Sequence, residues 1–128
     1  MPKILVADDE DDIRRLLSEF LMSRGYTAVA VQNGKEALNM VDLDPSIPVV
    51  LLDVIMPVAA GVDTLIEIMK RKPHPSVVMM SALADRHIAQ DALRLGALDY
   101  ILKPLDLSEV ESAISAGTSR FEFRKDHR

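Results

Sequence analysis

The chain has 128 residues, of which 48% are hydrophobic and 27% charged, with a formal net charge of −5 and a pI near 5.1. That length and composition fit one globular domain, and the acidic balance argues against direct nucleic-acid binding, which needs a basic surface. The absence of cysteine excludes disulfides and thiolate zinc sites. The sequence shows neither a signal peptide nor an apolar run of the ~18 residues that span a membrane, so we expect a cytoplasmic α/β domain.

The N-terminal segment begins with an apolar run at residues 3–7, which predicts a strand that leads directly into the five acids of residues 8–12. The helix dipole favours acids in a first turn, so we expect Asp11 or Asp12 to cap a helix that ends at Gly25. Its core-facing positions follow helical spacing and are Ile13, Leu16, Leu17, Phe20 and Leu21.

The next segment predicts a strand over residues 27–31 and a short helix over residues 35–41. Residues 49–53 then form an apolar run that ends in one carboxylate, before a Met56-Pro57 turn. A continuous apolar run is typical of a parallel strand buried on both faces, and ligands bind outside the carboxyl ends of such strands. Asp53 is therefore expected at the functional edge of the sheet.

The second half repeats the alternation of helix and strand. A helix after Gly61 has three predicted inward positions, which are Leu65, Ile66 and Met69. A strand over residues 77–80 follows, and then a helix that Gly96 closes and whose inward positions are Ile88, Ala92, Leu93 and Leu95. Residues 99–102 predict the fifth strand, and Ser108 with Glu111 predicts a capping box for the last helix.

Five strand–helix units in succession predict a doubly wound parallel sheet in the flavodoxin-like order 2-1-3-4-5. We expect one domain over residues 1–119 and a charged tail or linker stub over residues 120–128. Two interpretations of Phe121 and Phe123 in that tail stay open, a frayed end and a docking stub.

Polar side chains follow four of the predicted strands at their carboxyl ends: Asp8 and Asp9, Asp53, Ser81, and Lys103. The order 2-1-3-4-5 makes the first and third strands neighbours, so three carboxylates converge and repel one another. An all-oxygen site of this kind suits Mg²⁺. With a lysine and a hydroxyl beside it, the site is suited to phosphoryl transfer, and Asp53 is the expected nucleophile.

The chain resembles the receiver domain of two-component response regulators. The resemblance rests on motifs in a fixed order, which are Asp8-Asp9, Asp53 with Met56-Pro57 and Gly61, Ser81-Ala82, Gly96-Ala97, Asp99-Tyr100 and Lys103-Pro104. It implies a signalling phosphoacceptor rather than an enzyme, although such domains catalyse their own phosphorylation and dephosphorylation. Asp53 would take a phosphoryl group from a histidine kinase or a histidine phosphotransfer protein.

The resemblance also implies a ligand set for Mg²⁺, formed by Asp8, Asp9, Asp53 and the backbone carbonyl of Ile55. Ser81 and Lys103 would contact the phosphoryl oxygens, Tyr100 would be the aromatic switch, and the Lys103–Pro104 bond would be cis. The surface that changes would comprise the fourth helix, fifth strand and fifth helix. A downstream protein target, an effector domain or a second copy in a phosphorylation-dependent dimer would bind there.

The chain departs from the family pattern at Ala59 and Ala60, since many relatives carry an acid or amide just before Gly61, and the last helix has no basic residue before Arg120. Two other functions stay open. A haloacid-dehalogenase-like phosphatase would need a second acid two residues after the nucleophile, where Ile55 stands. A degenerate receiver would act unphosphorylated as an interaction module, and the intact acids and Lys103 argue against it.

Overall fold

The computed structural model describes residues 2–56 and 61–127. Five parallel strands form one sheet in the order β2-β1-β3-β4-β5, which confirms the predicted fold class. The strands are β1 (Lys3–Ala7), β2 (Thr27–Val31), β3 (Val49–Asp53), β4 (Ser76–Ser81) and β5 (Asp99–Leu102). The helices are α1 (Asp11–Ser23), α2 (Gly34–Leu43), α3 (Gly61–Met69), α4 (Arg86–Arg94) and α5 (Leu107–Asp126).

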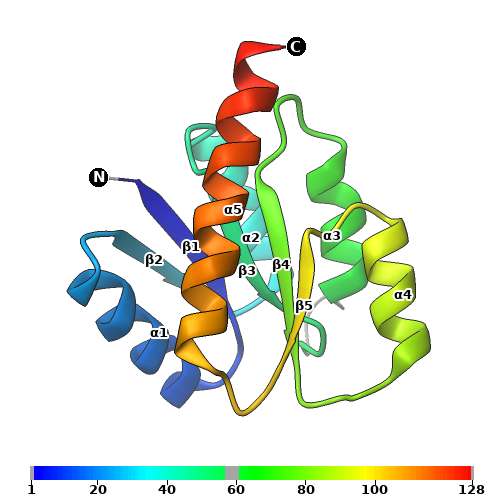
Figure 1. Ribbon diagram of the computed structural model, residues 1–128. Coiled ribbons are helices and arrows are strands. Elements are labelled where there is room, and N and C mark those ends of the chain that lie inside the picture. Colours follow the sequence, from blue (N-terminus) through cyan, green and yellow to red (C-terminus); the bar gives the residue numbers. More distant parts are fainter. Residues whose placement is uncertain (1, 57–60, 128) are drawn as a thin grey trace.

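Helices cover both faces of the sheet, as Figure 1 shows. The α1 and α5 helices pack on one face, where Val49 and Leu51 of β3 join their core cluster. The α2, α3 and α4 helices pack on the other face, where Val50 and Leu52 of the same strand belong to a second cluster. Successive residues of a strand point to opposite faces, so β3 is buried along its whole length, as its apolar run predicts.

The parallel register brings the strand ends that carry polar residues to one edge. Ala7 of β1 pairs with Leu52 of β3, and Asp53 pairs with Met80 of β4. Ser81 in turn pairs with Leu102 of β5. The residues at or just after these ends therefore face a common region below the sheet in Figure 1.

Two predicted helix caps are wrong. Glu10, with extended backbone angles (φ −89°, ψ 120°), is the N-cap of α1, and Asp11 and Asp12 lie in its first turn. At α5 the cap is Asp106, whose carboxylate accepts hydrogen bonds from the N–H groups of Ser108 and Glu109. In both cases the expected cap lies inside the helix, because the cap position follows the backbone angles rather than residue type alone.

The predicted inward faces of three helices are too wide. Leu17 and Leu21 of α1 are fully buried, and so are Leu65 of α3 and Ala92 of α4. Four leucine and isoleucine side chains that the spacing predicted to be inward are instead exposed, namely Leu16, Ile66, Leu93 and Leu95. No helix in the described part of the chain combines the length and apolar character that a membrane crossing requires.

The segment expected to be a tail continues α5 as far as Asp126. Phe121 is fully buried, whereas Phe123 is 62% exposed. The helix is held on the sheet by hydrogen bonds from Arg124 Nη2 to Ser76 Oγ (2.8 Å) and from Ser76 Oγ to the Gly117 carbonyl (2.8 Å). A domain boundary at residue 119 would cut through this packed helix.

We predict that Phe121→Ala lowers the free energy of unfolding by about 3–5 kcal/mol, because it leaves a cavity where a fully buried ring stands. Phe123→Ala, two residues along the same helix, should change it by no more than about 0.5 kcal/mol. Urea denaturation followed by circular dichroism measures both values. Equal losses in the two variants would contradict the different burial of the two rings.

Candidate functional site

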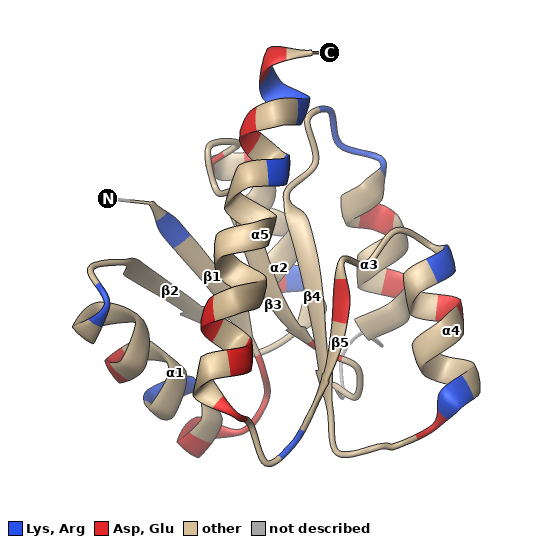
Figure 2. Cartoon of the chain, in the orientation of Figure 1, with Lys and Arg blue, Asp and Glu red and all other residues tan. Residues whose placement is uncertain are grey.

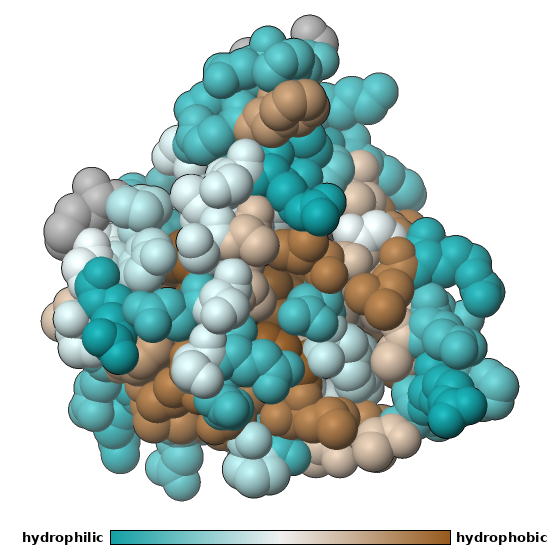
Figure 3. All heavy atoms as spheres, in the orientation of Figure 1, coloured by the Kyte–Doolittle hydropathy of each residue, from teal (hydrophilic) through white to brown (hydrophobic). Residues whose placement is uncertain are grey.

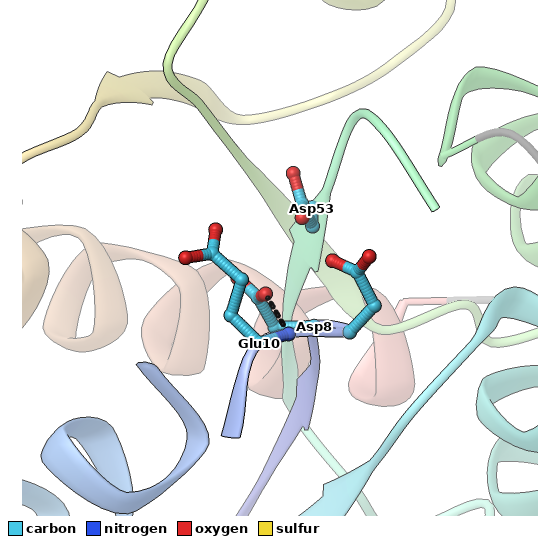
Figure 4. A group of neighbouring side chains, drawn as sticks. Asp8, Glu10 and Asp53 are labelled. Carbon is cyan, nitrogen blue, oxygen red and sulfur yellow. Dashed lines mark hydrogen bonds between the residues drawn. The ribbon is translucent and has the colours of Figure 1, made fainter. Parts of the chain in front are cut away.

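Two buried carboxylates lie at neighbouring strand ends. Asp8 directly follows β1 and is fully buried, and Asp53 ends β3 with 4% exposure. Asp9 and Glu10 are exposed, but each offers a carboxylate oxygen to the same group, in which all four ligand atoms lie within 4.8 Å of one another. Figure 4 shows Asp8, Glu10 and Asp53 gathered around the ends of the two strands. The structure thus brings together all three acids predicted for the site.

Lys103 supplies the positive charge that this cluster requires. Its Nζ lies 2.9 Å from Asp8 Oδ2, 2.9 Å from Glu10 Oε1 and 3.4 Å from Asp53 Oδ2, and its side chain is only 10% exposed. The residue stands in the loop between β5 and α5. In Figure 2 this loop carries a basic stretch in blue, and the loop that follows β1 is acidic and red. The Lys103 N–H donates to the Ser81 carbonyl (2.8 Å), and the Lys103–Pro104 peptide bond is cis.

Burial and mutual charge change the protonation of this cluster. Burial first, and then the neighbouring Asp8 carboxylate, raise the pKa of Asp53 from 3.8 to about 6, although Lys103 and the Ile55 N–H oppose the rise. Burial by itself would lower the pKa of Lys103, but its close contacts with the Glu10 and Asp8 carboxylates and the charges of Asp8 and Asp53 raise it overall. The lysine is therefore charged at neutral pH, and Asp53 ionises less readily than an ordinary aspartate.

The acids keep free coordination capacity for a cation. The Glu10 N–H donates to Asp8 Oδ1 (2.9 Å), the bond dashed in Figure 4, and the Ile55 N–H donates to Asp53 Oδ1 (3.2 Å). Asp8 Oδ2 is buried and, among the described residues, receives no hydrogen bond of good geometry despite its ion-pair distance to Lys103. A buried carboxylate oxygen without a donor suits a hard cation, so these residues fit the expected Mg²⁺.

The site opens into a cavity of about 340 Å³. Its lining combines acids, a lysine, a hydroxyl and apolar groups, which are Asp9, Glu10, Asp53, Ile55, Ser81, Ala82 and Lys103. Ser81 is almost completely buried, and the Ile55 side chain is 55% exposed. The predicted residues Asp53, Ser81 and Lys103 thus share one cavity, and Tyr100 is not part of its lining.

Tyr100 is connected to Ser81 through the backbone of Leu83. Ser81 Oγ accepts a hydrogen bond from the Leu83 N–H (2.9 Å), and the Tyr100 hydroxyl donates to the Leu83 carbonyl (3.0 Å). One residue of the β4–α4 loop is therefore held by both predicted switch residues. No sequence motif indicates this link, because it uses main-chain atoms of a leucine that lies outside every motif.

Two further residues complete the site. Glu10 was part of the predicted acidic run but was not assigned to the site, and its place directly after Asp8-Asp9 was the available signal. Gly61 lies so close to the Asp53 carbonyl that a Cβ would collide with it and would come within 2.7 Å of Val54 Cα. Glycine is therefore required there. The predicted Met56-Pro57 turn and the alanines at 59 and 60 fall wholly or partly in residues 57–60, outside the described residues.

We predict that Asp53→Asn stabilises the metal-free protein at neutral pH. Because the folded-state pKa of Asp53 is raised, folding favours its protonated form, and stability is lost as pH rises from about 4 to 6. The amide is neutral throughout, so the gain in unfolding free energy should grow from pH 5 to pH 7.5 and reach about 1–3 kcal/mol.

Urea denaturation of both proteins in EDTA measures this gain at each pH. Asp63→Asn is the control, since Asp63 is an exposed aspartate in the first turn of α3. A gain that is constant across the pH range would contradict a raised pKa for Asp53.

Comparison with known proteins assigns this geometry to a family. The family described as "Response regulator receiver domain" matches residues 4–115. Regulatory protein AtoC of Escherichia coli (strain K12) is 37% identical over 130 residues, which cover 98% of this chain and 28% of AtoC. Transcriptional regulatory protein CpxR of the same strain is 37% identical over 116 residues, which cover 91% of this chain and 49% of CpxR. The chain thus spans less than half the length of either regulator.

Solved structures agree with the sequence matches. A response regulator receiver domain protein from Clostridium thermocellum has a TM-score of 0.90 and 31% identity, with 96% of this chain and 98% of that chain covered. The receiver domain of Francisella response regulator 1452 has a TM-score of 0.86 and 28% identity, with 94% and 98% covered. Together with the family match, these likenesses show that the chain belongs to the response regulator receiver domain family of two-component systems.

Proposed function

We propose that the chain is a phosphorylation-dependent switch whose phosphoacceptor is Asp53. The observation that carries this proposal is a buried carboxylate that shares a cavity of about 340 Å³ with Lys103 and Ser81. One carboxylate oxygen, Oδ1, accepts a hydrogen bond from the Ile55 N–H, and the other lies 3.4 Å from Lys103 Nζ. The nucleophile is thus oriented by the backbone and lies next to a cation that offsets developing negative charge.

The proposed donor is a phosphohistidine of a histidine kinase or of a phosphotransfer protein. A carboxylate oxygen of Asp53 forms a bond to phosphorus while the phosphorus–nitrogen bond breaks, and the leaving imidazole nitrogen takes up a proton. Asp8, Asp9 and Asp53, with the Ile55 carbonyl, are the proposed holders of Mg²⁺, which when bound neutralises charge on the phosphoryl oxygens. Lys103 and Ser81 are proposed to contact those oxygens.

The proposed output is a change in the surface formed by α4, β5 and α5. Ser81 and Tyr100 hold the two main-chain groups of Leu83, so a Ser81 hydroxyl that turns toward a phosphoryl oxygen would release the Leu83 N–H. The loop that moves leads directly into α4. Beside it, Leu93, Tyr100 and Leu102 line a cavity of about 320 Å³, and Figure 3 shows hydrophobic side chains on this side of the molecule.

This surface is the proposed binding place for a downstream protein target, an effector domain or a second copy of the chain. Leu93 and Leu102 are 47% and 46% exposed, so a partner would remove apolar area from water. A phosphatase of the haloacid-dehalogenase type is disfavoured by the family assignment, since Ile55 has no proton to donate where that chemistry needs an acid. A degenerate receiver is the remaining alternative.

We predict that acetyl phosphate with Mg²⁺ adds one phosphoryl group to the protein and that Asp53→Asn prevents this addition. Asparagine keeps the shape of the side chain but is not nucleophilic. Intact-protein mass spectrometry measures the modification, and Asp63→Asn is the matched control at an exposed position. An unmodified wild-type protein would favour the degenerate receiver, and full modification of Asp53→Asn would place the acceptor elsewhere.

We also predict that Ser81→Ala binds a beryllofluoride phosphoryl mimic but switches incompletely. A shift from 1:99 to 99:1 requires about 5.5 kcal/mol, and a charge-assisted hydrogen bond contributes about 1.5–3 kcal/mol, so Lys103 without Ser81 is insufficient. Amide shifts across residues 82–107 in NMR spectra measure the extent of switching.

Tyr100→Phe is the second variant in this experiment, because it keeps the ring and removes only the hydroxyl bond to Leu83. Its amide shifts around the phosphoryl site should match those of the wild type, while those of α4 and β5 should be reduced. If the amide shifts of Ser81→Ala change as far as those of the wild type, Ser81 is excluded as the coupling element.

A further inference from the structure

The charge of Lys103 is shared among three carboxylates, and one of them differs from the other two. An ammonium group has three N–H donors, and Asp8, Glu10 and Asp53 all lie within 3.4 Å of it. The side chains of Asp8 and Asp53 are 0% and 6% exposed, whereas that of Glu10 is 57% exposed. A phosphoryl oxygen that contacts this ammonium therefore competes with carboxylates that already surround it.

Glu10 is the partner that is lost most easily. A buried carboxylate that loses its cation keeps an uncompensated charge in a poorly solvated place, whereas an exposed carboxylate becomes hydrated. Asp8 and Asp53 are also fixed in the site by main-chain hydrogen bonds, from Glu10 N–H and Ile55 N–H. The Glu10 side chain has a hydrogen bond to Lys103 Nζ at 2.9 Å as its anchor.

The backbone of Glu10 directs the side chain to this position. Glu10 is the N-cap of α1, yet its side chain makes no capping hydrogen bond to the described helix. Its N–H is bound to Asp8 Oδ1 (2.9 Å), and its carbonyl accepts from the Arg14 N–H (3.1 Å). The nearby Arg14 guanidinium pairs with Asp11 and the Asp8 carbonyl instead. The cap geometry therefore presents Glu10 to a lysine 93 positions further along the chain.

We propose that Glu10 is a positioning residue that competes with the incoming phosphoryl group for the Lys103 ammonium, and so sets how readily the site accepts a phosphoryl group. This inference rests on the proposed function of Asp53. In the resting protein Glu10 keeps the lysine occupied. On phosphorylation the lysine turns to the phosphoryl oxygens, and the released Glu10 carboxylate is hydrated.

Two effects of Glu10 act in the same direction. The ion pair must break before Lys103 can serve the phosphoryl group, and the Glu10 charge lies within the 4.8 Å group of oxygens where phosphoryl charge would accumulate. Both effects oppose the anion. Removal of the charge with retention of size should therefore favour binding of a phosphoryl mimic rather than weaken it.

The test is a beryllofluoride titration at a fixed, saturating Mg²⁺ concentration, followed by NMR, of wild type and Glu10→Gln. We expect Glu10→Gln to bind about two- to fivefold more tightly, the range that an ion pair with one exposed partner supports. Its phosphorylation by acetyl phosphate should accelerate by a similar factor. Asp12→Asn, which removes the same charge from an exposed position two residues later, should bind as the wild type does.

Two further variants separate contact from charge. Glu10→Asp keeps the charge but shortens the side chain, so tighter binding in this variant as well would identify the lost contact as the cause. In a Lys103→Met background, Glu10→Gln should bring a smaller gain in beryllofluoride affinity, because the ion pair between Glu10 and Lys103 is already absent. In the metal-free protein, Glu10→Gln should also shift the NMR resonance of the Lys103 ammonium, a readout that does not depend on phosphorylation.

Unchanged or weaker beryllofluoride binding by Glu10→Gln would overturn the proposal. Weaker binding together with a lower Mg²⁺ affinity would show instead that Glu10 acts as a metal ligand. Failure of the underlying function has a different signature, since a wild-type protein that binds no beryllofluoride and accepts no phosphoryl group would refute the role of Asp53 itself.

Discussion

The structure depends on the burial of two like charges, Asp8 and Asp53, at neighbouring strand ends. Their carboxylates are almost fully buried and repel each other, and Lys103 is the cation that lies within 3.4 Å of both. Parallel strands in the order β2-β1-β3-β4-β5 force this proximity, because β1 and β3 are adjacent although they are far apart in sequence. Repulsion at this point is unfavourable for folding, and a cation bound beside the two acids would offset it.

The rest of the site compensates for this burial through main-chain groups. The N–H groups of Glu10 and Ile55 each bind one oxygen of the two acids, and Gly61 permits the chain to pass close to the Asp53 carbonyl. The loop after β5 places the Lys103 ammonium next to both acids. These contacts come from four different segments, so the site joins loops that lead into separate helices.

The most direct route from the site to the surface passes through Leu83. Its N–H is held by Ser81, inside the cavity, and its carbonyl by Tyr100, at the edge of the exposed apolar surface beside α4 and β5. In the proposed switch, these two hydrogen bonds hold the element whose equilibrium phosphorylation at the site would bias. Glu10 and Lys103 form an ion pair in the lining of the same cavity.

The alternation of apolar runs and helical patterns was sufficient to predict the five strands and a doubly wound sheet, and the flavodoxin-like order gathers Asp8, Asp53, Ser81 and Lys103 at one edge. The folded chain was needed for the caps at Glu10 and Asp106, for the burial of Phe121 and for the pairing of Glu10 with Lys103. These features depend on backbone angles at element ends and on contacts between residues distant in sequence, and neither leaves a local periodic signal.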